Sequence, residues 1–116
     1  MYSARDIDKR TYDFAVRIIK LYQHLDRKPG QQILRAGTSI GANIQEAQAG
    51  QSRADFISKN AIALKESRET SYCLRLLSTA GILPEARLSE LQNKVQEITR
   101  IIASIIVSAK RNGQNL

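Results

Sequence analysis

Residues 84–111, PEARLSELQNKVQEITRIIASIIVSAKR, carry the pattern that decides the fold. Their apolar side chains recur at steps of three and four residues, the spacing that places side chains on one face of an α-helix. A half-buried strand would instead alternate apolar and polar residues, and this segment does not. The stretch therefore predicts a long amphipathic helix with Leu88, Leu91, Val95, Ile98, Ile102, Ile105 and Ala109 on its buried face.

Three earlier segments show the same period and predict helices over about 8–25, 31–49 and 53–80. Turn residues separate the segments at Lys28-Pro29-Gly30, Gly50-Gln51-Ser52 and Gly81-Ile82-Leu83-Pro84. Ser52 suits a helix N-cap, and Gly81 suits the left-handed residue that follows a helix. Four amphipathic helices with short loops predict one all-α domain over residues 1–116, an antiparallel up-down four-helix bundle.

The expected buried faces of these three helices contain more than apolar residues. Asn60, Ser67 and Ser71 interrupt the third face. They form either a polar site inside the bundle or satisfied core groups, with both serines facing the second helix. We favour the second interpretation. The expected buried face of the first helix consists of Ile7, Phe14, Ile18, Leu21 and Leu25. That of the second consists of Ile33, Gly37, Ile40, Ile44 and Ala47, and that of the third of Phe56, Ile57, Asn60, Leu64, Ser67, Ser71 and Leu74.

Composition excludes several classes of protein. One cysteine cannot form an internal disulfide, and with one histidine it cannot form a zinc site. No Glu-x-x-His pair is present, which excludes a di-iron bundle, and no cofactor is expected. The longest apolar run, residues 101–107, is far shorter than the roughly 18 residues that a membrane span needs. The first residues, MYSARD, lack an apolar signal core, which indicates a cytoplasmic protein.

Residues 37–41, GTSIG, match G-x-S-x-G, the nucleophile elbow of serine hydrolases. That elbow requires a strand–turn–helix setting, whereas this string lies inside an apolar helical pattern. No other cluster of titratable residues suggests catalysis, so we do not expect an enzyme. The small residues instead predict a thin helix that lets a neighbour approach closely, at Ala36, Gly37, Ser39, Gly41, Ala42 and Ala47.

The apolar surface exceeds the roughly 100° stripe that one bundle seam requires. Residues beside or opposite the buried faces suggest a second buried surface and hence self-association, with scattered surface residues as the alternative. They are Tyr12, Ala15, Val16, Ile19 and Tyr22 in the first expected helix and Ile62, Cys73, Leu76 and Leu77 in the third.

The chain carries 18 Lys and Arg against 11 Asp and Glu, a formal net charge of +7, which makes a polyanion the first partner to consider. Residues 1–35 hold eight basic and four acidic side chains. Arg10, Arg17, Lys20, His24, Arg27 and Lys28 fall within about 100° of arc, as the 3.6-residue period dictates. This basic stripe suits phosphate contacts. The alternative is a solvated face with ordinary i,i+4 ion pairs, Asp13 with Arg17, Asp55 with Lys59, Lys65 with Glu69 and Glu90 with Lys94.

Three motifs resemble one known family. They are RAGTSIGANIQEA at 35–47, SRADFISK at 52–59 and ALKESRET at 63–70. Together they are similar to the bacterial four helix bundle protein family, which includes proteins encoded inside intervening sequences of large-subunit ribosomal RNA genes. The similarity extends from about Arg10 to Arg111. The family is also similar in fold to accessory proteins of diversity-generating retroelements.

The resemblance implies an up-down four-helix protomer, a ring-like homopentamer and no catalysis. In the retroelement branch it implies a partnership with a reverse transcriptase and nucleic acid. Four motif residues, Arg35, Ser39, Asn43 and Glu46, recur at three- and four-residue steps. We interpret them as a structural polar rib that joins neighbouring helices or protomers.

We therefore predict a non-enzymatic, basic homopentamer that binds RNA or DNA. The phosphate contacts are assigned to Arg10, Arg17, Lys20, Arg27 and Lys28. The alternative function is a protein-interaction scaffold, as an accessory subunit for the reverse transcriptase of a diversity-generating retroelement.

Overall fold

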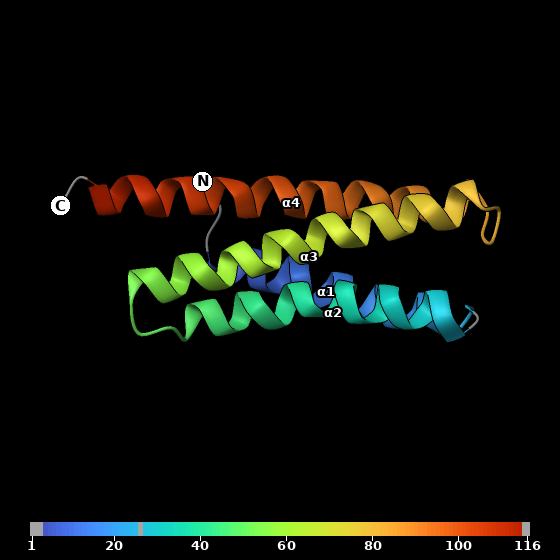
Figure 1. The fold of residues 1–116 in the computed structure, drawn as a ribbon, viewed down its shortest axis with the longest axis horizontal. Coiled ribbons are helices and arrows are strands. Elements are labelled where there is room, and N and C mark those ends of the chain that lie inside the picture. The colour runs from blue at the N-terminus through green and yellow to red at the C-terminus, as the bar shows by residue number, and fades with distance from the viewer. Residues whose placement is uncertain (1–3, 26, 115–116) are drawn as a thin grey trace.

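The computed structural model describes the backbone of residues 4–25 and 27–114. It contains four helices, α1 (Ala4–Tyr22), α2 (Arg27–Gln48), α3 (Arg53–Thr79) and α4 (Glu85–Gln114), with no strand among the described residues. The helices run alternately up and down along one axis, and the molecule measures 51 × 20 × 19 Å (Figure 1). This arrangement confirms the prediction of an all-α four-helix bundle. None of the described helices combines the length and apolarity needed to cross a lipid bilayer.

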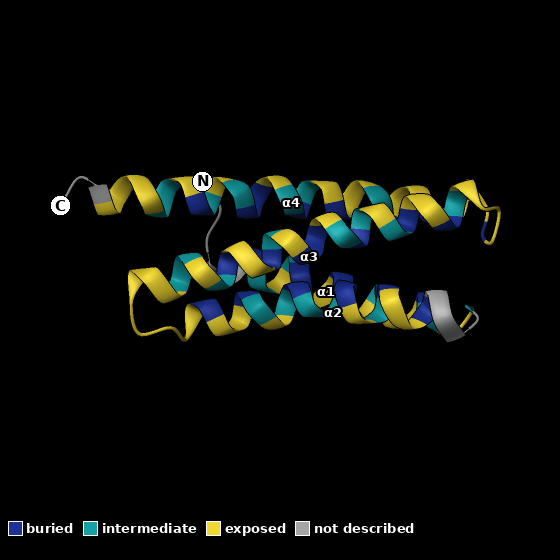
Figure 2. Ribbon diagram, viewed as in Figure 1, coloured by how far each residue is buried: buried dark blue, intermediate teal, exposed yellow. Residues whose placement is uncertain are grey.

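Each helix packs on the next one in the chain, and the bundle closes where α1 meets α4 along a smaller contact. The buried residues line the inner side of every helix (Figure 2). The predicted apolar faces are correct in outline, because all five predicted residues of α2 and most of those in α1 and α4 are buried. Periodicity alone missed Ala63, Glu66, Thr70 and Leu77 in α3 and Ile101 and Ile106 in α4.

The first connection lies earlier than predicted. The expected break at Lys28-Pro29-Gly30 is wrong, since α2 begins at Arg27 and these residues occupy its first turn. A proline is tolerated there because the first-turn N–H groups have no partner within the helix. Gly30 also lets α1 approach, since a Cβ at this position would lie 3.1 Å from Cδ1 of Tyr22. The chain turns instead at residues 23–25, where the N–H of His24 donates to the carbonyl of Leu21 at 2.9 Å.

The other two connections confirm the turn prediction. Ser52 caps α3 by accepting a hydrogen bond from the N–H of Asp55 at 3.1 Å. At the far end Gly81 has φ +72°, and the N–H of Ile82 donates to the carbonyl of Leu77 at 3.1 Å. This is the glycine-terminated helix end that satisfies the last carbonyl groups.

The polar residues on the inner face of α3 are satisfied core groups. Asn60 donates to the carbonyl of Phe56 at 2.9 Å. Both serines, however, form their hydrogen bonds between helices with α4: Ser67 bonds Thr99 at 2.8 Å, and Ser71 accepts from the Gln92 amide at 3.2 Å. The prediction that the serines face the second helix is therefore wrong.

The small residues of α2 do allow close approach. A Cβ at Gly37 would lie 2.8 Å from Cγ1 of Ile18, and one at Gly41 would lie 3.3 Å from the carbonyl oxygen of Thr11. A Cβ at Gly37 fits only if Ile18 shifts, and one at Gly41 would require the Thr11 backbone to give by a few tenths of an ångström, so Gly37 above all sets the distance between α1 and α2. The string GTSIG at 37–41 lies wholly inside α2, and hence has no strand–turn–helix elbow geometry.

Most of the surplus apolar residues are exposed. Tyr12 is 70% exposed, and Val16 and Ile19 follow it at helical spacing on α1. Ile62 and Leu76 are exposed on α3, whereas Leu77 is only 4% exposed and belongs to the core. Ala15, Tyr22 and Cys73 are half-buried. Burial raises the pKa of the Cys73 thiol, as does the charge of Glu69, so the thiolate is disfavoured.

Candidate nucleic-acid interface

The basic stripe predicted on α1 lies partly in the seam with α4, where carboxylates face it. Arg10 bonds Asp6 at 2.9 Å and also bonds Glu97 of α4. Arg17 bonds Oε1 of Glu90 through Nη1 at 2.9 Å. These contacts hold α1 against α4 and offset the charge of both arginines before any ligand arrives.

Of the other three residues assigned to phosphate contacts, Lys20 is exposed near the end of α1. The side chains of Arg27 and Lys28 lie outside the described residues. The assignment of phosphate contacts to these five residues therefore stays a prediction, and two of the five, Arg10 and Arg17, already bond carboxylates.

The four expected i,i+4 ion pairs are not the ones that form between the described side chains. Asp13 pairs with Lys9 at 2.8 Å, and Glu90 pairs with Arg17. The hydrogen bond from Arg17 lowers the pKa of Glu90. Lys59 reaches Glu46 of α2 at 3.0 Å. Most pairs thus join helices, because tertiary packing offers these side chains nearer partners than their own helix does.

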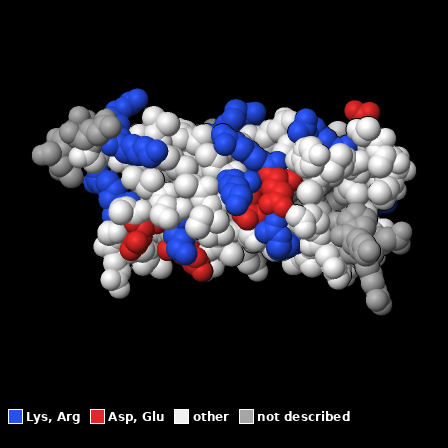
Figure 3. Space-filling view, in the orientation of Figure 1, with Lys and Arg blue, Asp and Glu red and all other residues white. Residues whose placement is uncertain are grey.

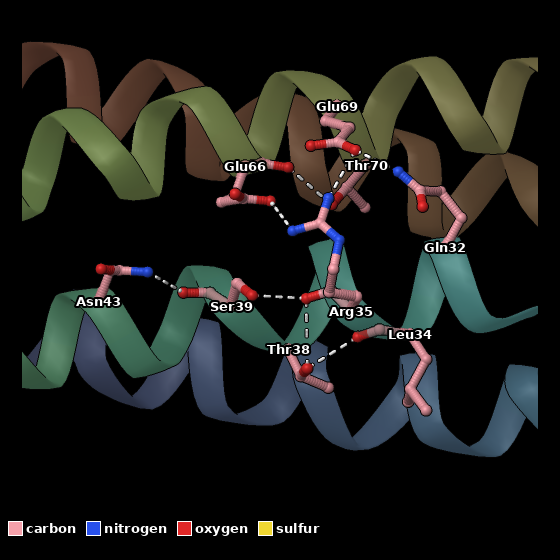
Figure 4. A network of polar contacts seen from close by, with 9 residues as sticks. All are labelled: Gln32, Leu34, Arg35, Thr38, Ser39, Asn43, Glu66, Glu69 and Thr70. Atoms are coloured by element: carbon pink, nitrogen blue, oxygen red, sulfur yellow. Dashed lines mark hydrogen bonds and ion pairs between the residues drawn. The ribbon is translucent and has the colours of Figure 1, made fainter.

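A polar network joins α2 to α3 (Figure 4). Arg35 contacts Glu66 at 3.1 Å and Glu69 at 2.6 Å, and Gln32 donates to the same Glu69 carboxylate. The hydrogen bond between Arg35 and Glu69 raises the pKa of the arginine and lowers the pKa of the glutamate. Glu66 is buried, so Arg35 supplies the charge that a buried carboxylate requires.

The other three residues of the predicted polar rib bond either within α2 or across to α3. Ser39 donates to the carbonyl of Arg35 at 2.6 Å, and Asn43 donates to the carbonyl of Ser39 at 2.9 Å. Glu46 meets Lys59 of α3. Within this protomer Arg35 and Glu46 therefore connect α2 to α3, while Ser39 and Asn43 bond their own helix; contacts between protomers stay a prediction.

The clearest concentration of available positive charge lies on the opposite side of α3. An open groove between α3 and α4, which we call the arginine groove, is lined by Arg68, Ser71, Arg75, Gln96, Thr99 and Arg100. No carboxylate belongs to this lining. Among the described residues, no ion pair involves Arg68, Arg75 or Arg100.

Two hydrogen bonds fix the walls of the arginine groove relative to each other. Ser67 with Thr99 and Ser71 with Gln92 both join α3 to α4 beside the groove. Arg68 and Arg75 lie two helical turns apart on α3, about 10 Å along the axis. The three guanidinium groups therefore project from two helices held in fixed register, which suits a site better than mobile loops would.

The space-filling view shows where charged side chains lie on one face of the molecule (Figure 3). Lys and Arg side chains gather over the middle of α3 and α4, next to one acidic patch (Figure 3). Lys65 and Arg68, both exposed, are three residues apart on α3. A guanidinium group carries five N–H donors in a planar fork that matches phosphate oxygens. The arrangement can bind successive phosphates of an extended polyanion without displacing an internal carboxylate.

Comparison with known proteins identifies a family and a solved structure of similar fold. Residues 5–104 match the family model described as 23S rRNA-intervening sequence protein. A solved structure from Bacteroides thetaiotaomicron, described as a protein with unknown function from the S23 ribosomal protein family, is 45% identical with a TM-score of 0.85. The similarity covers 86% of this chain and 97% of that chain. The search of curated proteins found no match.

Proposed function

The chain belongs to the 23S rRNA-intervening sequence protein family, and from that premise we propose that it is a cytoplasmic, non-enzymatic protein that binds RNA or DNA through phosphate contacts. One observation carries the proposal: three arginines converge on a groove whose lining contains no carboxylate. The net charge of +7 adds a long-range attraction toward polyanions.

The basic stripe on α1 and the arginine groove differ in the ion pairs that a bound phosphate would have to break. On α1 a phosphate competes with Glu90 and Glu97 for the guanidinium groups of Arg17 and Arg10. In the arginine groove no ion pair between described residues has to be broken first, because no carboxylate lines it. We therefore assign the main contacts to the groove, and the predicted α1 residues to a supporting role.

Binding by wild-type protein is expected to be tight at low salt and to weaken steeply as salt rises, because phosphate contacts release counterions. Fluorescence anisotropy with labelled RNA and DNA measures it, between about 50 and 200 mM salt. An affinity that does not change over this range contradicts the proposal, as does the absence of any binding at micromolar protein.

We also propose that the protein assembles as a ring-like homopentamer, as the resemblance implies. The exposed apolar face of α1 formed by Tyr12, Val16 and Ile19 supports contact between copies, since large apolar patches favour association. The mass in solution, measured by light scattering, is expected to be five times 13.0 kDa. A monomer would contradict both the number and the role of the α1 face.

A further inference from the structure

Tyr72 lies beside the arginine groove on the outer face of α3. Its side chain is 54% exposed, and the guanidinium carbon of Arg75 lies 5.8 Å from the centroid of its ring. Arg68 precedes it by four residues and Arg75 follows it by three, so all three share one helix face. An exposed aromatic ring therefore lies among the cations that line the groove.

We infer that the nucleic acid bound in the arginine groove is single-stranded, with one of its bases stacked on Tyr72. The inference rests on the proposed function and specifies its ligand. A positively charged groove combined with an aromatic platform is the arrangement that single strands use, because every unpaired base offers a flat π-face. In a duplex these faces are stacked inside the helix and inaccessible.

The contact with Arg75 favours this role for the ring. A cation within about 6 Å of an aromatic face is attracted to it, which restricts the ring orientation before a ligand binds. The planar guanidinium group still has donors for a neighbouring phosphate. One residue pair can therefore contact the base and the backbone of the same strand.

The test compares an oligouridine of about 16 nucleotides, near the upper end of known site sizes for single strands, with an RNA hairpin of equal length and charge. Wild-type protein is expected to bind the single strand more tightly. Tyr72→Ala is expected to weaken single-strand binding about tenfold, since stacking on one aromatic ring contributes that much, and to change hairpin binding less than about twofold.

Two matched variants separate stacking from loss of apolar surface. Tyr72→Phe keeps the ring and is expected to retain single-strand affinity. Leu76→Ala removes an exposed apolar side chain one turn further along α3, and is expected to leave both affinities unchanged. Circular dichroism checks that each variant is folded, which exposed positions should allow.

Several results would overturn the inference. They are equal loss of strand and hairpin binding in Tyr72→Ala, no loss in either, or the same loss in Leu76→Ala. A change of assembly mass in Arg68→Ala would also overturn it, by making the groove a contact between copies. If wild-type protein binds neither RNA, the proposed function itself fails.

Discussion

Replacing Arg68, Arg75 and Arg100 together with alanine is expected to weaken nucleic-acid binding at least about 100-fold at physiological salt. A hydrogen bond that involves a charged group contributes about 1.5–3 kcal/mol, and 1.4 kcal/mol is a factor of ten in affinity. Three such contacts exceed 100-fold even where their effects are not additive. Anisotropy titration with the triple variant measures the loss.

The salt dependence of the same variant identifies the contacts as phosphate contacts. Each phosphate neutralised on a single strand contributes about −0.7 to the slope of log affinity against log salt. The triple variant should therefore have a slope shallower by about 2. A weaker affinity with an unchanged slope would place these arginines outside the phosphate contacts.

A matched variant removes the same number of cations from α1. Arg10, Arg17 and Lys20 changed together to alanine lower the net charge by the same three units, yet they include two arginines already bound to carboxylates. We expect the nucleic-acid affinity to fall less than about fivefold, because the variant removes long-range electrostatic attraction and not direct phosphate contacts. A larger loss of affinity in the α1 variant than in the groove variant would place the main interface on α1, as the sequence predicts.

Periodicity was enough to predict the four helices, and tertiary packing explains where it failed. Steps of three and four residues located the inner faces because each helix buries one stripe against its neighbours. Leu77 was predicted on a surplus apolar face, yet it is only 4% exposed and belongs to the same buried core as Leu83, close to the C-terminal end of α3. Pro29 looked like a turn because proline stops a helix, but it can also begin one.

The candidate interface was harder to predict because it depends on which helices are neighbours. The carboxylates that engage Arg10 and Arg17 lie on α4, more than 70 residues away in sequence. Arg68 and Arg75 share a face of α3 and were readable as a pair, but Arg100 joins them only after α3 and α4 pack. The partnership with a reverse transcriptase concerns a second protein and stays a prediction.

Gly37→Leu is expected to lower the free energy of unfolding by about 3 kcal/mol, at the upper end of the range for overpacked cores. Even the first added atom would lie 2.8 and 2.9 Å from the two γ carbons of Ile18, which is completely buried. Leucine has a better helix propensity than glycine by under about 1 kcal/mol, which offsets only part of this cost. Urea unfolding followed by circular dichroism measures the change.

Ile18→Ala provides the decisive comparison, because it opens the space that the larger side chain of Gly37→Leu would need. Alone it should cost about 2–5 kcal/mol through the cavity it leaves. Combined with Gly37→Leu, the total side-chain volume between α1 and α2 is nearly conserved, a change that cores tolerate well. The free energy of unfolding of the double variant should therefore exceed the value expected from adding the two single losses by at least about 1 kcal/mol. Strict additivity would show that Gly37 does not set the distance between the helices, and that its small size serves another contact.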